Sequence, residues 1–478
     1  MYRMEQRIWQ ILPIGPTGFA DSPYQSFSSF AANPILISLE DLWYDGLIDR
    51  ATLADFPHTN EKHIDFGRVI PLRKKILYQA AENFLSSAAG SLQDDYREFA
   101  QKQKYWLDDF ALFIAIKEAH KDVSWVNWPK GLRDREPAAL KKAMKVYQQK
   151  IAMVKVLQFL FDRQWRDVKR GASELGIRIV GDIPIFVAHD SADVWANPHL
   201  FDLDRNGNPR VVAGVPPDYF SKTGQRWGNP LYRWDVHKEE NFAWWTSRVK
   251  RMLDWVDIIR IDHFRGFSAY WEIPGKSKTA IKGRWVKAPG RDLFKTLKQE
   301  LGELPVIAED LGFITKDVIK LRDDFDLPGL RILQFAFGSD DAKNSFLPKN
   351  YPKNCVAYTG THDNDTVSGW FTRRPGEGST DTAKVIEKER KQALKVLGSQ
   401  GDEIHWDFLK SLLRSNAGAT IVPLQDIMGL GSDARMNTPS TIGSNWGWRF
   451  TWNDLTPDTM NRFASLTKRT KRGFSNKK

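Results

Sequence analysis

The feature that most constrains the fold is a series of seven short apolar segments, each followed by polar residues or by Gly and Pro. Such runs are typical of strands that are buried on both faces of a parallel sheet. Helical patterns lie between most of them, for example over residues 151–168, where apolar side chains recur every three or four positions. Repeated strand–helix units predict an α/β fold with a parallel sheet, either open or closed into a barrel. The segments are Ile8–Ile14, Ile177–Val187, Val256–Asp262, Pro305–Glu309, Leu330–Phe337, Cys355–Thr359 and Ala419–Leu424.

Two connections between these segments are too long for simple crossovers. Residues 35–175 include charged amphipathic stretches and predict a mostly helical inserted subdomain. Residues 188–255 are rich in Pro, Gly, Asn and Trp, which favours a loop insert over an active site. The remaining segments, 1–34, 176–187 and 256–478, are assigned to one discontinuous catalytic barrel.

Composition excludes several classes of protein. A hydrophobic content of 41% excludes a disordered chain, and the single cysteine, Cys355, excludes internal disulfides and a Cys-based zinc site. No apolar run approaches the roughly 18 residues of a membrane-spanning helix. The opening residues lack a secretory signal pattern, so we expect a cytoplasmic protein, or a plastid protein if the source is a plant or alga.

The formal charge of +11 raises the question of nucleic-acid binding. Six basic side chains lie within residues 468–478, the rest of the chain has mixed charge, and no nucleic-acid-binding motif is present. We therefore expect neither a nucleic-acid nor a membrane partner. The 19 tryptophans favour carbohydrate binding modestly, because flat rings pack against the C–H faces of sugars but also fill ordinary cores.

Four carboxylates stand at or just after the carboxyl ends of predicted strands: Asp182, Asp262, Glu309 and Asp363. In a (β/α) barrel this edge collects catalytic groups. Each alone could be a helix cap or an ion-pair partner, but four at equivalent positions favour an active site. Acetal cleavage needs one carboxylate that attacks the anomeric carbon and a second, with a raised pKa, that protonates the leaving oxygen. Arg260 points to the same face of its strand as Asp262 and is expected to keep it ionised.

Other chemistries have weaker support. Residues 202–207 begin like a calcium loop, but Ala213 stands where a bidentate Glu is required. Residues 362–365 match no strong metal pattern, and Walker, dinucleotide-binding and serine-hydrolase motifs are not found. We expect neither a metal nor a cofactor.

Longer motifs add a family resemblance. The chain resembles glycoside hydrolase family 77, the 4-α-glucanotransferases or amylomaltases, whose fold is a (β/α)8-type TIM barrel of the α-amylase kind. The long motif in 212–235 is more specific than the short acidic motifs, which α-amylase-type enzymes share. The matching segments are LPIGPTGFADSPYQSFSSFAANP (12–34), GDIPIFVAHDSADVWANP (181–198), VAGVPPDYFSKTGQRWGNPLYRWD (212–235), IIRIDHFRGF (258–267), IAEDLG (307–312), YTGTHDNDT (358–366) and VPLQDIMGLGSDARMNTPSTIGSNWGWR (422–449).

The resemblance implies a role for each matching residue. Asp262 matches the nucleophile, Glu309 the general acid/base, and Asp363 the third carboxylate, which stabilises the transition state. Further residues match positions that bind or cover the sugar, although the aromatic ones could instead pack the loop. These positions are Arg260, His263, His362, Asp182, Tyr24, Tyr219, Phe220 and Trp227.

The implied reaction is a retaining double displacement on α-1,4-glucans. Asp262 would take a glucan segment as a covalent ester, and Glu309 would then activate the 4-hydroxyl of a second glucan or of glucose. The two carboxyl groups are then expected about 5–5.5 Å apart. An aromatic loop that excludes water would favour transfer over hydrolysis.

One departure from the family pattern leaves alternatives open. Only seven strands are predicted where a closed barrel has eight, so we expect the first barrel strand to be missing from this chain. The first alternative is an α-glucan hydrolase with the same carboxylates. The second is an inactive glucan-binding remnant, and nucleic-acid binding comes last.

Overall fold

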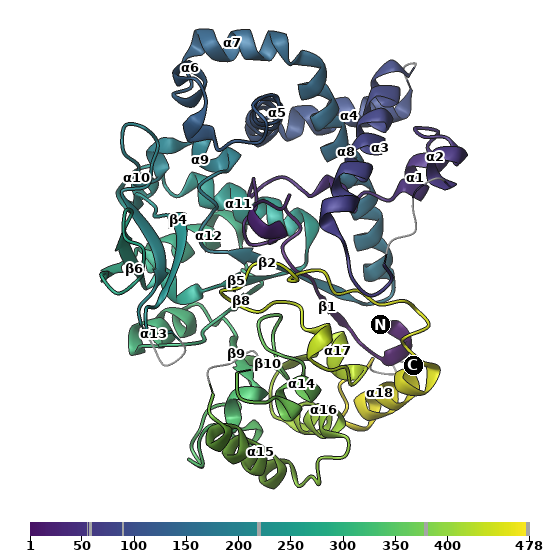
Figure 1. Cartoon of the computed structure of the whole chain (residues 1–478), viewed down its shortest axis with the longest axis vertical. Coiled ribbons are helices and arrows are strands. Elements are labelled where there is room, and N and C mark those ends of the chain that lie inside the picture. Colours follow the sequence, from purple (N-terminus) through teal and green to yellow (C-terminus); the bar gives the residue numbers. More distant parts are fainter. Residues whose placement is uncertain (55, 57–59, 88–89, 218–220, 377–380, 475–478) are drawn as a thin grey trace.

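The computed structural model describes residues 1–478 except 55, 57–59, 88–89, 218–220, 377–380 and 475–478. Its centre is a parallel sheet of seven strands that curves into a nearly closed barrel (Figure 1). The strands follow one another around the barrel in chain order, so each strand–helix unit adds one strand beside the last. Six of the seven predicted segments contain one of these strands and the seventh, Leu330–Phe337, overlaps one, which confirms the TIM-barrel type of fold. The strands are β1 (Ile8–Gln10), β2 (Arg178–Pro184), β5 (Ile258–Asp262), β8 (Val306–Ala308), β9 (Gly329–Ile332), β10 (Cys355–Tyr358) and β11 (Ala419–Ile421).

Successive side chains along each strand point to opposite faces of the barrel wall. Val180, Leu330 and Val356 belong to a buried cluster with other strand residues, while Ile179 and Ile259 join the larger core shared with the helices. Both faces are therefore apolar, as the continuous hydrophobic runs in the sequence predict.

The connection between β1 and β2 is helical. Its last helix, α8, packs against α3 and α5 and leads directly into β2. The apolar stripe predicted on α8 is buried at Val154, Leu157 and Leu160, which ties these helices to the common core. The helices are α1 (Leu39–Tyr44), α2 (Arg50–Ala54), α3 (Phe66–Ser86), α4 (Ser91–Lys102), α5 (Lys104–Ala119), α6 (Lys130–Arg133), α7 (Pro137–Val146) and α8 (Gln148–Glu174).

A second, four-stranded antiparallel sheet was not predicted. Its order is β4-β3-β6-β7, with strands β3 (Val211–Val215), β4 (Gln225–Pro230), β6 (Ala269–Pro274) and β7 (Arg284–Lys287). The sheet joins segments from both sides of β5, and β4 carries Trp227. The division into barrel, helical subdomain and loop insert stays a prediction.

Most of the remaining helices surround the barrel. The last of them, α18, contacts the N-terminal residues, where Gln6 Nε2 donates to Thr467 Oγ1 at 2.9 Å, so the two ends of the chain lie close together (Figure 1). None of the described helices is long and apolar enough to cross a membrane. These helices are α9 (Ala192–Ala196), α10 (Trp234–Glu239), α11 (Ala243–Trp255), α12 (Gly290–Leu301), α13 (Lys316–Asp324), α14 (Val367–Thr372), α15 (Ala383–Leu397), α16 (Ile404–Arg414), α17 (Leu424–Ile427) and α18 (Pro457–Arg469).

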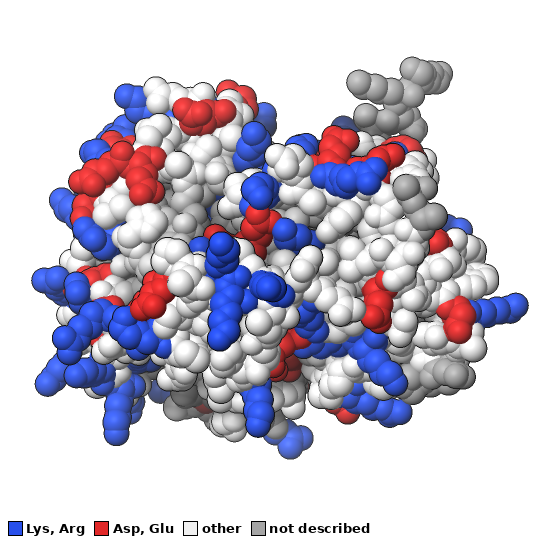
Figure 2. All heavy atoms as spheres, turned by 90° about the horizontal axis from the view of Figure 1, so that it is seen from above, with Lys and Arg blue, Asp and Glu red and all other residues white. Residues whose placement is uncertain are grey.

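Charge is mixed over the face seen in Figure 2. Basic side chains are interspersed with acidic and uncharged ones among the described residues of this face. This distribution differs from the basic stripe that a nucleic-acid-binding surface presents.

Candidate active site

The candidate residues gather at the carboxyl end of the barrel. Register places Asp182 of β2 opposite Arg260 of β5, and Pro184 opposite Asp262. Glu309 follows β8 directly, and His362 follows β10 after a short turn. The parallel direction of the strands therefore brings residues from four strands to one edge, as in other barrel enzymes.

Arg260 connects two of the carboxylates. Its guanidinium is buried and donates from Nη1 to Asp182 Oδ2 at 2.6 Å, and its Nη2 lies 2.9 Å from Asp262 Oδ1. Burial lowers the pKa of Arg260, but Asp182 and Asp262 outweigh it and leave the pKa well above its usual range. The side chain is therefore a fixed cation beside Asp262, whose own side chain is 32% exposed.

Tyr24 completes the support of Asp182. Its hydroxyl donates to Asp182 Oδ2 at 2.8 Å, the same oxygen that Arg260 contacts. Burial and then the Asp182 carboxylate raise the pKa of Tyr24 well above its usual range, so the hydroxyl stays protonated and available as a donor. Asp182 is itself only 1% exposed, and burial raises its pKa.

Glu309 has the environment of an acid. It is 9% exposed, and its two carboxyl oxygens accept from the backbone N–H groups of His263, at 2.7 Å, and Leu311, at 2.8 Å. Burial and the nearby charge of Asp262 raise the pKa of Glu309 to about 8, although Arg260 and the two N–H groups favour the ionised form. Glu309 is therefore protonated at neutral pH, which is the state a general acid requires.

His263 shapes the turn between the two carboxyl groups. Its φ of 53° lies in the left-handed region, which is uncommon for a residue other than Gly and turns its N–H toward Glu309. Burial lowers the pKa of His263 to about 4, so the ring is neutral. The ring meets Trp227 edge to face, with centroids 4.7 Å apart. Strand β4 therefore contributes an aromatic side chain beside His263, the residue that follows Asp262.

The segment after β10 places His362 and Asp363 on the other side of the site. The His362 ring stacks on Tyr24 with centroids 5.0 Å apart, and its Nε2 lies 3.4 Å from Asp363 Oδ1. Asp363 is held by the C-terminal loop, because Asn437 Nδ2 donates to its Oδ1 at 2.6 Å and Arg435 Nη2 donates to its backbone oxygen at 2.7 Å.

Three contributors from this loop were not predicted as site residues. Arg435 and Asn437 hold Asp363, and Trp446 lies 5.7 Å from both the Tyr24 and the His362 rings. All three lie within the quoted segment 422–449, but no strand or helix pattern indicated which of its side chains face the carboxylates.

The structure brings together most of the residues expected from the sequence. Asp182, Arg260, Asp262, His263 and Glu309 form one group, and Tyr24 links it to His362 and Asp363. Trp227 lies against His263. Tyr219 and Phe220 lie outside the described residues. Within the described ranges no group of three or more His, Cys, Asp or Glu side chains could hold a metal ion.

These features define a class of protein: a parallel-barrel enzyme with a buried, protonated carboxyl group beside an arginine-bound carboxylate, the pair that glycosidic-bond cleavage requires. The family model described as 4-alpha-glucanotransferase matches residues 1–456. The chain belongs to the 4-alpha-glucanotransferase family, which confirms the resemblance noted in the sequence.

Individual relatives agree with this assignment. The chain is 46% identical to the 4-alpha-glucanotransferase of Thermus thermophilus over 98% of its own length and 92% of the relative. It is 47% identical to the 4-alpha-glucanotransferase of Synechocystis sp. over 96% of its own length and 89% of the relative. The solved amylomaltase of Streptococcus agalactiae in complex with acarbose superposes with a TM-score of 0.93 at 38% identity, covering 99% of this chain and 93% of the other. These relatives do not favour the hydrolase or the inactive remnant.

Proposed function

We propose that the chain performs its family's transfer reaction on α-1,4-glucans through the carboxyl groups described above. It moves a glucan segment from a donor malto-oligosaccharide, starch or glycogen chain to the 4-hydroxyl of another glucan or of glucose. The observation that supports this most strongly is the contrast between protonated Glu309 and arginine-bound Asp262 at the end of neighbouring strands.

In the first step, Asp262 attacks the anomeric carbon while Glu309 gives its proton to the departing glycosidic oxygen. Arg260 lies against Asp262 and stabilises its negative charge until the covalent ester forms. Once the nucleophile is esterified its charge is gone, and one cause of the raised pKa of Glu309 disappears. The pKa of Glu309 then falls, and the ionised carboxylate can accept a proton, as the second step requires.

In the second step, Glu309 removes the proton from an incoming 4-hydroxyl, and that oxygen displaces Asp262 from the anomeric carbon. The Asp363 side chain is half-exposed and held by Asn437, in keeping with contacts to sugar hydroxyls that strengthen in the transition state. Tyr24, His362 and Trp446 form an aromatic group that a sugar face could pack against.

Maltotriose incubated with the purified protein tests this function. A ladder of longer malto-oligosaccharides together with glucose is the expected result. Glucose and maltose without longer products would instead identify a hydrolase. We also propose a cytoplasmic location, in keeping with the single buried, unpaired Cys355.

A further inference from the structure

The loop that carries His362 and Asp363 is fixed at both ends by one side chain. It runs from Thr359, directly after β10, to Val367, the first residue of α14. Asp426 of α17 accepts from Thr359 Oγ1 through its Oδ2 and from the backbone N–H of Val367, at 2.7 Å, through its Oδ1. Because both oxygens belong to one planar carboxylate, the ends of the loop cannot separate without breaking one of these bonds.

The contacts at Asp426 lie in the interior of the protein. Thr359 and Val367 are fully buried and Asp426 is 1% exposed, so water has no access to replace either bond. Within the part of the chain that the structure describes, no basic side chain forms an ion pair with Asp426. Burial, and to a smaller extent the charge of Asp365, raise the pKa of Asp426 to about 6, although its two hydrogen bonds favour the ionised form. At pH 7 the loop is therefore held by a buried carboxylate whose charge costs the fold stability.

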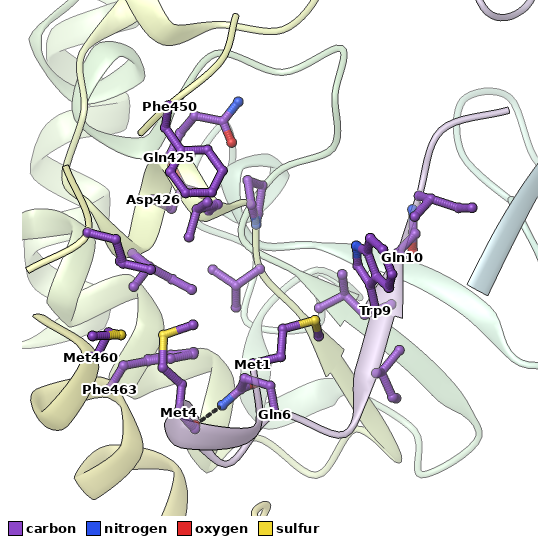
Figure 3. A pocket seen from close by; sticks show the side chains of 18 of the residues that line it. Met1, Met4, Gln6, Trp9, Gln10, Gln425, Asp426, Phe450, Met460 and Phe463 are labelled. Atoms are coloured by element: carbon purple, nitrogen blue, oxygen red, sulfur yellow. Dashed lines mark hydrogen bonds between the residues drawn. The ribbon is translucent and has the colours of Figure 1, made fainter. Parts of the chain in front are cut away.

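A second side chain of α17 fixes the segment on the other side of Asp363. Gln425, which lies next to Asp426 in Figure 3, donates from Nε2 to the backbone oxygen of Ala434 at 3.2 Å. The following residue, Arg435, donates to the backbone oxygen of Asp363 at 2.7 Å. Helix α17 therefore holds the loop that carries Asp363 and also the segment that binds this loop from outside.

We propose that Asp426 is a positioning residue for the transfer reaction, which holds the loop 359–367 so that the Asp363 carboxylate lies where the transition state requires it. The inference rests on the proposed function, in which Asp363 contacts sugar hydroxyls. Asp426 is too deeply buried to touch the sugar, so it acts through Asp363. A displacement of about 1 Å in such a group can lower the rate about 10²-fold.

Two substitutions at this position separate the hydrogen bonds from the charge. In Asp426→Asn the amide oxygen can still accept from Val367, and the amide nitrogen can donate to the Thr359 hydroxyl, which then accepts. Asp426→Ala removes both bonds. We expect Asp426→Ala to lower kcat about 10- to 100-fold with KM within about threefold of wild type, and Asp426→Asn to keep kcat within about threefold. Because Asp426→Asn also removes a buried charge, it should unfold at no lower urea concentration than wild type at pH 7.

The decisive measurement combines Asp426→Ala with Asp363→Asn. If Asp426 acts through Asp363, its loss has no further effect on kcat once the Asp363 carboxylate is gone, whereas an independent structural effect multiplies with it. Gln158→Ala is the matched control, because Gln158 is also buried and makes two hydrogen bonds to loop backbone, at Ala32. It should lower the free energy of unfolding while kcat stays within about twofold of wild type.

Thr359 gives an independent test of the same contact, which applies even if Asp426→Ala does not fold. Thr359→Ser keeps the hydroxyl and should transfer glucans as wild type does, whereas Thr359→Val removes it and should lower kcat about tenfold. Equal kcat in Thr359→Ser and Thr359→Val would overturn the proposal. So would equal losses in Asp426→Asn and Asp426→Ala, a change in KM alone, or an undiminished effect of Asp426→Ala in the Asp363→Asn background.

Hydrogen exchange of the amides in 361–366 reports on the loop without any glucan present. These amides should exchange faster in Asp426→Ala than in wild type, and equal exchange would overturn the proposal. If exchange is faster but wild type makes no longer malto-oligosaccharides from maltotriose, the proposed function is wrong while the anchoring of the loop by Asp426 stands.

Discussion

Replacing Glu309 with glutamine tests two properties of this residue. One is proton donation in the reaction, and the other is the effect of its buried, protonated carboxyl group on the free energy of unfolding. The folded protein raises the pKa of Glu309 from 4.5 to about 8, mainly by burial and then by the charge of Asp262. Unfolding restores the ordinary value. Between these two pH values the folded state therefore holds a proton that the unfolded chain releases.

The sign of the effect follows from this difference. Because the folded state binds more protons, the free energy of unfolding falls as pH rises from 4.5 to about 8. The slope is about 1.4 kcal/mol per pH unit for one proton, so wild type loses about 3 kcal/mol between pH 4.5 and pH 7 through this group. A glutamine at this position has no proton to release, so Glu309→Gln should remove this slope.

The substitution has a second effect that does not vary with pH. The carboxyl oxygens accept from the N–H groups of His263 and Leu311, and a glutamine amide can accept only one of these bonds. An unpaired buried donor costs about 1–3 kcal/mol at every pH. The informative quantity is therefore the change in stability with pH rather than its absolute value.

Urea unfolding of wild type and variant at pH 5, 6 and 7 measures this change. Glu300→Gln, at an exposed position on α12, is the control and should follow wild type. The variant should also transfer natural glucans about 10²–10⁴-fold more slowly while retaining more activity on donors with good leaving groups. A stability slope equal to that of wild type, or equal slowing on both donors, would refute the assignment of Glu309 as a buried, protonated acid.

The other predictions concern the groups around Glu309. Asp262→Asn should lower transfer by more than about 10³-fold while urea unfolding stays cooperative; substantial residual turnover would exclude it as nucleophile. Tyr24→Phe removes a hydrogen bond to a carboxylate, worth about 1.5–3 kcal/mol, so kcat/KM should fall about 10- to 100-fold. Asn437→Ala should lower kcat with little change in KM if it positions Asp363, and a change in KM alone would contradict that role. Finally, kcat/KM should decline above about pH 8, where Glu309 loses its proton, and a profile flat to pH 10 would contradict the pKa.

The sequence predicted the parts of the fold that regular patterns encode. Each of the seven barrel strands lies in or overlaps a short apolar run with clear boundaries, and α8 has a regular apolar stripe. The small antiparallel sheet was not predicted because β3 pairs with β6, about 60 residues away along the chain. Its pairing depends on contacts that no local pattern reports.

The same distinction applies to the site. Asp182, Asp262 and Glu309 could be predicted because they lie at strand ends, and parallel strands bring their ends to one edge. Asn437 and Trp446 could not, since they lie in an irregular loop whose approach to His362 and Asp363 is set by tertiary packing. The raised pKa of Glu309 likewise required the burial and the distances that only the structure supplies.

Strand β5 explains how one element gives two carboxyl groups opposite properties. Alternation places Arg260 and Asp262 on the same face, so the nucleophile meets a buried cation 2.9 Å away. The next residue, His263, turns into the left-handed region, and its N–H then binds Glu309 instead of continuing the strand. Glu309 is thereby held close enough to Asp262 for that charge to raise its pKa, while Arg260 pairs with Asp262 and only partly offsets the effect at Glu309.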